Sequence, residues 1–233
     1  MREIHAVRLY TYIVCLVLLV LTALWIKPQY AAFPPLETWS MILGYLAYVC
    51  IAITLLIGPI RPWLPKRWTA HSQYLRRDLG ILAGLAAIAH VLLVFILFSG
   101  EHRLMLINSG ANPPNSILSL FIHVYPGEET ALYPNWSLVG IANYLGLAAL
   151  LIVLCLWLTS SDKATSWLGA PAWKRLHMGN PFLFVLVVFH ALIYVHSIKG
   201  NPHSFADFLW LAAIVAAVRS ISFARTIRAR HKR

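Results

Sequence analysis

Charged side chains are scarce in this chain of 233 residues. Asp, Glu, Lys and Arg make up 12% of it, against about 25% in soluble domains, while hydrophobic residues make up 60%. Acidic residues are the scarcer kind, with eight against nineteen Lys and Arg, and the formal net charge is +11. Because the basic residues flank apolar segments, they predict membrane topology and no binding to nucleic acid. The composition is typical of an integral membrane protein.

The chain also lacks the motifs of several kinds of chemistry. Cys15, Cys50 and Cys155 each lie inside an apolar run, so we expect them to be packing residues and not disulfide or zinc pairs. No Gly-x-Gly-x-x-Gly motif follows a strand pattern, so the sequence offers no flavin or nicotinamide domain of its own. No acidic residue lies in the middle of a predicted span, which argues against a proton-coupled carrier.

Six apolar segments are long enough to cross a bilayer, which takes roughly 20 residues. They predict an all-α membrane protein, a six-transmembrane-helix bundle that forms a single domain over residues 1–233. We place the spans at about 9–26, 39–60, 79–98, 136–158, 181–198 and 205–221. Residues 100–135 form a long outer connection, and its apolar part Ile117–Tyr125 is too short to span.

Lysine and arginine gather on one side of this predicted bundle. All of them fall on the side of the two termini except Lys27, Arg103 and Lys199. The positive-inside rule therefore predicts that both termini are cytoplasmic. An even number of spans returns the chain to its starting side and agrees with this. We expect the protein in a bacterial inner (plasma) membrane.

Two histidines lie at matching depth in the predicted bundle. His90 comes ten residues before Gly100 in the third span, and His190 comes ten residues before Gly200 in the fifth. At 1.5 Å per residue, both lie about 15 Å below the outer ends of helices that run in the same direction. Histidine inside a bilayer is costly and marks a functional site. The pair predicts a haem held between the third and fifth helices by two axial histidines; the alternative is two histidines that only pack between helices.

A third histidine, His177, comes thirteen residues before His190. The segment Gly179–Pro181 predicts a break in the helix between them. His177 could ligate a second haem about 20 Å from the first, or contact a haem propionate or a quinol. Its partner is missing, because the third span has Arg76 where a second histidine is needed, and His71 is a weak substitute.

Arginines cluster at the inner ends of the two histidine-bearing helices. Arg67, Arg76 and Arg77 precede the third span, and Arg175 precedes the fifth. Guanidinium groups suit carboxylates, so these side chains are candidates for binding haem propionates. The alternative is a topology signal with contacts to lipid phosphate. We expect Asp78 to pair with one of these arginines.

Together these features resemble the ferric reductase-like transmembrane domain. They are the six spans, Arg76-Arg77-Asp78 at the start of the third, His90 within it, and Trp173-Lys174-Arg175-Leu176-His177 followed by His190. Over roughly Met41–Ile221 the chain is most similar to the haem-binding membrane subunit of the periplasmic methionine sulfoxide reductase system (MsrQ type). The resemblance implies haem b, one or two per chain, with His90 and His190 as metal ligands of the central haem and His177 as the inner-side histidine.

The resemblance implies an oxidoreductase subunit that transfers electrons across the bilayer. The electron donor is expected to be a cytoplasmic flavin reductase or quinol, and the acceptor a redox partner protein at the outer face, with the cofactor performing the redox step. The outer loop of residues 100–135 is long for an MsrQ-type protein, so the outer partner of this chain can differ from that of the MsrQ type. Two alternatives are a haem-bearing structural subunit of a larger membrane redox complex and a non-redox transporter or assembly factor.

Overall fold

A computed structural model describes residues 2–99, 117–123, 133–198 and 202–231 of the chain. Within these residues six helical segments are long and apolar enough to cross a membrane. They are Leu9–Gln29, Pro35–Trp63, His71–Phe98, Leu138–Leu158, Ala170–Ser197 and Phe205–Ala229. The prediction of an all-α protein with six spans is confirmed, and the chain is an integral membrane protein. Arg103 and Lys199, used in the prediction of topology, lie outside the described residues.

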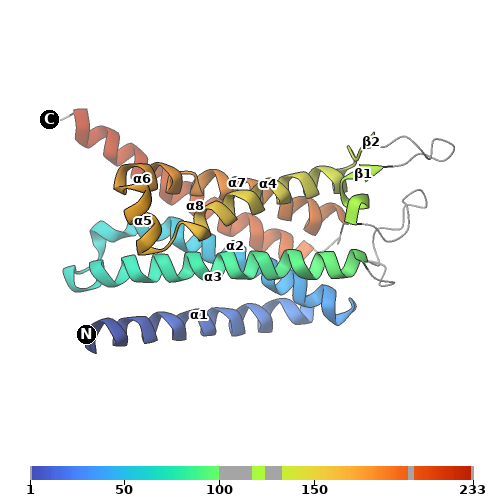
Figure 1. Ribbon diagram of the computed structural model, residues 1–233, viewed down its shortest axis with the longest axis horizontal. Helices are drawn as coiled ribbons and strands as arrows, with labels where there is room; N and C mark the ends of the chain where they lie inside the picture. The colour runs from blue at the N-terminus through green and yellow to red at the C-terminus, as the bar shows by residue number, and fades with distance from the viewer. Residues whose placement is uncertain (1, 100–116, 124–132, 199–201, 232–233) are drawn as a thin grey trace.

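The long helices lie side by side along the bundle in Figure 1. In chain order the elements are α1 (Arg2–Gln29), α2 (Pro35–Ile60), η1 (Arg61–Trp63), α3 (Lys66–Ser99), η2 (Ile117–Leu120), β1 (Ile122–His123), β2 (Tyr133–Pro134), α4 (Leu138–Leu158), α5 (Asp162–Leu168), α6 (Ala170–His177), α7 (Asn180–Leu192), the π-helix η3 (Ile193–Ile198) and α8 (Pro202–His231). The two short strands pair antiparallel.

Local sequence explains where several helices begin. Pro35 opens α2, since a fixed φ and a missing amide hydrogen suit the first helical position. Ser137 and Ser161 cap α4 and α5, and their hydroxyl groups accept from the amides of residues three positions later. Gly169 separates α5 from α6 with a φ of 74°, a conformation in which glycine avoids the steric cost of a Cβ.

The two ends of the bundle differ in what they carry. α1 begins and α8 ends at one end, together with α5 and α6 (Figure 1); we call this the terminal end. The other end carries η2, β1 and β2 and is called the loop end. Both termini therefore lie on the same side of the bundle, as an even number of spans requires.

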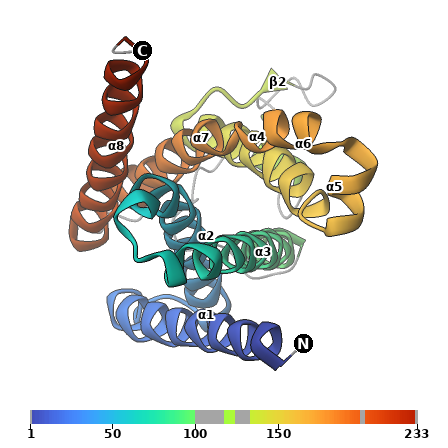
Figure 2. The ribbon, with the colours of Figure 1, turned by 90° about the vertical axis from the view of Figure 1, so that its left-hand side faces the viewer.

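α2 lies at the centre of the bundle and is the most buried of the six spans. It packs against α1, α3, α7 and α8, and Figure 2 shows these helices arranged around it. Tyr48 of α2 is fully buried, and its ring stacks on Phe184 of α7 and Phe208 of α8. Its hydroxyl donates to the Phe208 carbonyl at 2.8 Å, which satisfies the polar group inside the core.

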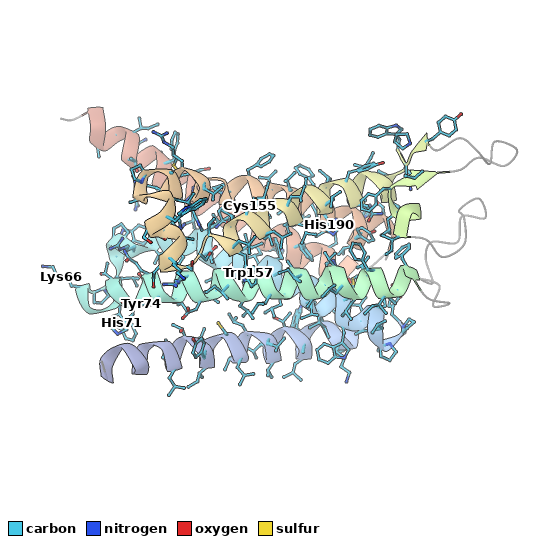
Figure 3. The ribbon with its side chains drawn as sticks, viewed as in Figure 1. Lys66, His71, Tyr74, Cys155, Trp157 and His190 are labelled. Carbon is cyan, nitrogen blue, oxygen red and sulfur yellow. The ribbon has the colours of Figure 1, made fainter. Side chains whose placement is uncertain are left out.

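A close approach between α3 and α4 depends on Gly84. A Cβ at this position would collide with the side chain of Trp157, which Figure 3 shows directed at α3. A glycine here lets the large ring pack directly against the backbone of α3. Gly80, one turn earlier on α3, has no such neighbour within 4 Å.

Candidate functional site

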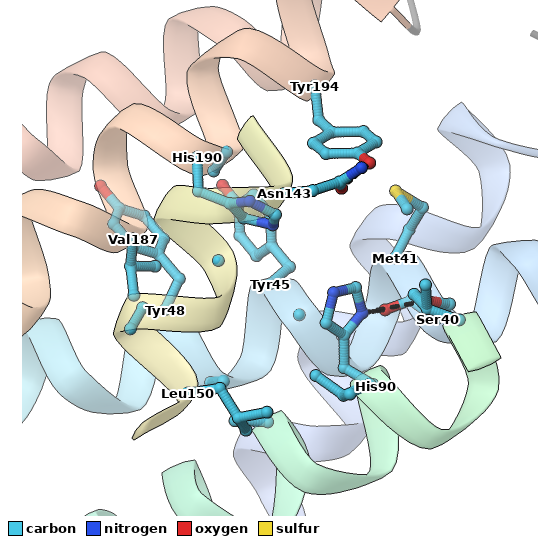
Figure 4. Close-up of a pocket in the computed structure, with 18 of the residues that line it drawn as sticks. Ser40, Met41, Tyr45, Tyr48, His90, Asn143, Leu150, Val187, His190 and Tyr194 are labelled. Carbon is cyan, nitrogen blue, oxygen red and sulfur yellow. Dashed lines mark hydrogen bonds between the residues drawn. The ribbon is translucent and has the colours of Figure 1, made fainter. Parts of the chain in front are cut away.

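His90 of α3 and His190 of α7 bring their rings together inside the bundle. The ring centroids lie 6.5 Å apart, and the ring planes are nearly perpendicular at 77°. Figure 4 shows both side chains reaching into one cavity from opposite walls. Residues a hundred positions apart in the sequence therefore meet at one depth of the bundle.

A backbone carbonyl of a neighbouring helix holds each ring. Nδ1 of His90 donates to the carbonyl of Ser40 at 2.8 Å, and the Ser40 hydroxyl lies 2.9 Å from the same nitrogen. Nδ1 of His190 donates to the carbonyl of Ala142 at 2.7 Å. Because a carbonyl can only accept, Nδ1 carries the proton in both neutral rings. Each ring then presents an unprotonated Nε2, the form that binds a metal ion.

A glycine lies one helical turn beyond each of these carbonyls. Gly44 follows Ser40 by four residues on α2, and Gly146 follows Ala142 by four on α4. A Cβ would lie 3.3 Å from the His90 ring at the first position and 2.8 Å from the His190 ring at the second. In a helix the amide of residue i+4 already bonds to the carbonyl of residue i. A glycine at i+4 leaves room for a second donor to reach that carbonyl. Both histidines are therefore held in the same way, by a carbonyl at residue i with a glycine at residue i+4.

The cavity between the histidines has mainly apolar walls. They come mainly from α2, α3, α4, α7 and α8 and include Ile51, Val91, Val94, Leu150, Val153, Leu183, Val187 and Phe208. Polar side chains also line the cavity, among them Glu37, Ser40, Asn143 and Tyr194. An apolar chamber with a few convergent polar groups is typical of a cofactor or ligand site.

A hydrogen-bonded chain links this chamber to the loop end. Tyr194 has its ring centroid 5.1 Å from that of His190, and its hydroxyl donates to Oδ1 of Asn143 at 2.5 Å. Nδ2 of Asn143 donates to the carbonyl of Leu120 in η2 at 2.9 Å. Tyr194 belongs to the π-helix η3, a rare conformation that is frequent at functional sites. These hydrogen bonds hold η2 over the end of α4, close to the histidine pair.

His177 occupies a separate place at the terminal end. It is the last residue of α6, and α7 begins at Asn180, so the predicted break between His177 and His190 is confirmed. The His177 ring stacks on Trp173 with a centroid distance of 4.2 Å, and its Nε2 lies 3.3 Å from the hydroxyl of Thr159. His71 packs against Trp68 in the first turns of α3, and Figure 3 shows it at the terminal end, far along the bundle from His190.

The arginines of the sequence prediction lie at the terminal end as well. Arg77 forms an ion pair with Asp162 of α5 at 2.8 Å, and Arg175 is exposed on α6. α3 is continuous from Lys66 to Ser99, so Arg76 lies fourteen residues, or about 21 Å of helix rise, before His90. Among the described side chains, Asp78 forms no ion pair with Arg76, Arg77 or Arg175, contrary to that part of the prediction. Its carboxylate accepts instead from the hydroxyl of Thr11 on α1.

Several residues around the histidines were not expected from the sequence. Glu37 lies just before the predicted second span of residues 39–60, but in the structure it belongs to the first turn of α2, is 1% exposed and lines the cavity. Ser40 and Ala142 act through backbone carbonyls, which no side-chain pattern reveals. Gly44 and Gly146 are the features of the sequence that could have indicated these contacts. A glycine within an apolar span often marks a position where another helix or side chain comes close to the backbone.

Comparison with known proteins identifies the family. Residues 43–188 match the family described as "Ferric reductase like transmembrane component", and because this match covers more than half of the chain, the protein belongs to that family. It is thus a transmembrane protein of the ferric reductase-like kind. A shorter stretch of 62 residues is 34% identical to the Magnetosome protein MamZ of Magnetospirillum gryphiswaldense. That stretch covers 27% of this chain and 10% of MamZ.

Proposed function

We propose that the chain binds haem b between α3 and α7, with His90 and His190 as the axial ligands, and transfers electrons across the membrane. The observation that carries this proposal is that the two imidazole rings meet in one cavity with their centroids 6.5 Å apart. An iron atom about 2 Å from one nitrogen of each ring would separate the ring centroids by about 6 Å. The observed separation fits that arrangement.

The donor set supports the same proposal. Both rings donate from Nδ1 to carbonyl oxygens, which fixes the tautomer and leaves Nε2 for a metal. No group of three or more His, Cys, Asp or Glu residues gathers to hold a metal ion in the part of the chain that the structure describes. Two histidines suffice for iron where a porphyrin supplies the other four ligands. The apolar chamber around the rings suits the macrocycle.

We propose a single haem in this chain. The second would need His177 and a partner on α3, but the His177 ring stacks on Trp173 and its Nε2 faces Thr159. Arg76 and Arg175 lie too far along their helices from the His90–His190 pair to reach the propionates of a haem held there. The candidates to meet propionates are instead polar side chains that line the cavity, among them Ser40, Asn143 and the tyrosines.

The haem would supply the one-electron step, and the chain supplies binding, orientation and burial. His90 and His190 would hold the iron, and the carbonyls of α2 and α4 keep both rings oriented. The mainly apolar walls of the cavity would surround the haem. We propose a quinol or a cytoplasmic flavin reductase as donor and a redox partner protein at the outer face as acceptor, in the manner of the MsrQ-type subunit, with both termini cytoplasmic in a bacterial inner membrane.

The reduced-minus-oxidised absorbance spectrum of the purified protein, with haem quantified per chain, tests the proposal. A b-type spectrum with one haem per chain is expected for the wild type and for His177→Ala. The haem should be lost in His90→Ala and in His190→Ala. A wild-type protein without haem, after expression with ample haem supply, would overturn the proposal.

A further inference from the structure

A groove opens at the terminal end, between the end of α2 and the last turns of α8. α2 and η1 contribute Ile60 and Trp63, and α8 contributes Val218, Ile221 and Arg225. Its volume is about 650 Å³, within the range of about 300–1,000 Å³ that holds small ligands. Figures 1 and 2 show the reason for the opening: the C-terminal part of α8 diverges from the other helices.

Most residues that line the groove are apolar, and Arg225 is cationic; we call Ile60, Val218 and Ile221 its apolar floor. The residues that α8 contributes recur at three- and four-residue spacing from Val218 to Ala229, so one face of the helix forms a whole wall. Val218 and Ile221 lie at one end of this stripe, and Arg225 lies a turn further on. The groove therefore offers hydrocarbon contact and a positive charge along a single wall.

Arg225 is held in place but keeps its donors available. Its guanidinium carbon lies over the Trp63 ring, 4.8 Å from the ring centroid, a cation–π contact that holds the charged group beside the groove. The ring face accepts no hydrogen bond in this contact, so the five N–H donors stay available for an acceptor. The ion pair between Arg77 and Asp162 is the only one among the residues that the structure describes. Among the described residues, therefore, no carboxylate forms an ion pair with Arg225.

The groove lies where two spans end. One candidate span ends at Trp63 and another at Ala229, which places the groove mouth near the boundary between hydrocarbon and water. Tryptophan is enriched at that depth, and Arg228 and Arg230 follow on the same helix. A molecule that enters the groove from the bilayer would meet the apolar floor with its chain and Arg225 with its headgroup.

We propose that this groove binds an anionic phospholipid. Its phosphate would accept hydrogen bonds from Arg225, and one acyl chain would lie against Ile60, Val218 and Ile221. Anionic headgroups are attracted to basic residues at the membrane surface, and basic pockets between transmembrane helices bind such lipids. The proposal goes beyond electron transfer and does not depend on haem.

Native mass spectrometry of the delipidated full-length protein in detergent tests this site. The protein is titrated with phosphatidylglycerol or with phosphatidylcholine of the same acyl chains. We expect phosphatidylglycerol to bind more tightly, and Arg225→Gln to weaken its binding about fivefold, the effect of one basic residue at a membrane surface. Arg228→Gln is the matched control, because it removes the same charge from the same helix outside the groove. Its effect on phosphatidylglycerol binding should be clearly smaller than that of Arg225→Gln, because Arg228 can act only through the general surface charge.

A second variant tests the apolar floor independently of charge. Val218→Trp fills the groove, so it should reduce retention of both lipids although Arg225 is intact. Equal binding of the two lipids to the wild type would overturn the proposal and indicate ordinary annular lipid. Equal losses in Arg225→Gln and Arg228→Gln would also overturn it, since the effect would then come from net charge.

Discussion

Replacing Gly146 with alanine would add a methyl group beside the His190 ring. The new Cβ would lie 2.8 Å from both Cε1 and Nδ1 of that ring, so the ring must move. Nδ1 is the atom that donates to the Ala142 carbonyl at 2.7 Å, and the movement lengthens this bond. Overpacking costs about 1–3 kcal/mol and a lost hydrogen bond about 1 kcal/mol. Losing the partner that orients a metal-binding histidine lowers metal affinity about 10–100-fold, so we expect haem binding to weaken at least tenfold.

Two other glycines supply graded controls for this variant. Gly44→Ala would place its Cβ 3.3 Å from the His90 ring, which needs a shift of only a few tenths of an ångström, so a smaller loss is expected. Gly80→Ala meets nothing within 4 Å and should leave haem binding unchanged. The assay is haem per chain after purification, together with the rate of haem transfer to an apoprotein acceptor. If Gly146→Ala holds haem as well as Gly80→Ala does, the argument for a close-fitting α4 is refuted.

Three further variants separate the roles of neighbouring residues. Ser40→Ala removes one acceptor from Nδ1 of His90 but keeps the carbonyl, so haem should stay bound with a higher reduction potential in a redox titration; an unchanged potential would show that the hydroxyl does not tune the ligand. Tyr194→Phe leaves Oδ1 of Asn143 buried without its donor, so thermal unfolding should show a loss of about 1–3 kcal/mol, and unchanged stability would contradict the bracing role. His177→Ala should keep the full b-type spectrum, whereas a loss of half the haem would reveal a second one.

The six spans and the histidine pair could be predicted because both depend on distance along the chain. A span is defined by the number of apolar residues needed to cross hydrocarbon. The equal depth of His90 and His190 follows from the helical rise and from where their helices end. Both predictions need only the sequence and the width of a bilayer.

The partners of the histidines could not be predicted in the same way. In a membrane helix the lipid-facing and the interior-facing side chains are both apolar, so periodicity says little about how each helix is rotated. That rotation decides that His90 meets Ser40 and that His190 meets Ala142. Asp78 is another case in which the sequence does not reveal the direction of a side chain. It directly follows Arg76 and Arg77, but adjacent residues on a helix face different directions. Its side chain contacts Thr11.

Low-temperature electron paramagnetic resonance of the oxidised protein tests the central claim most directly, namely that His90 and His190 bind one iron atom. Two imidazole ligands give low-spin ferric haem, so the wild type should show a low-spin signal. Wherever His90→Ala or His190→Ala retains haem, its signal should be high-spin, and added imidazole should restore the low-spin form. A high-spin signal in the wild type, or a low-spin signal that survives in either variant without imidazole, would contradict the account.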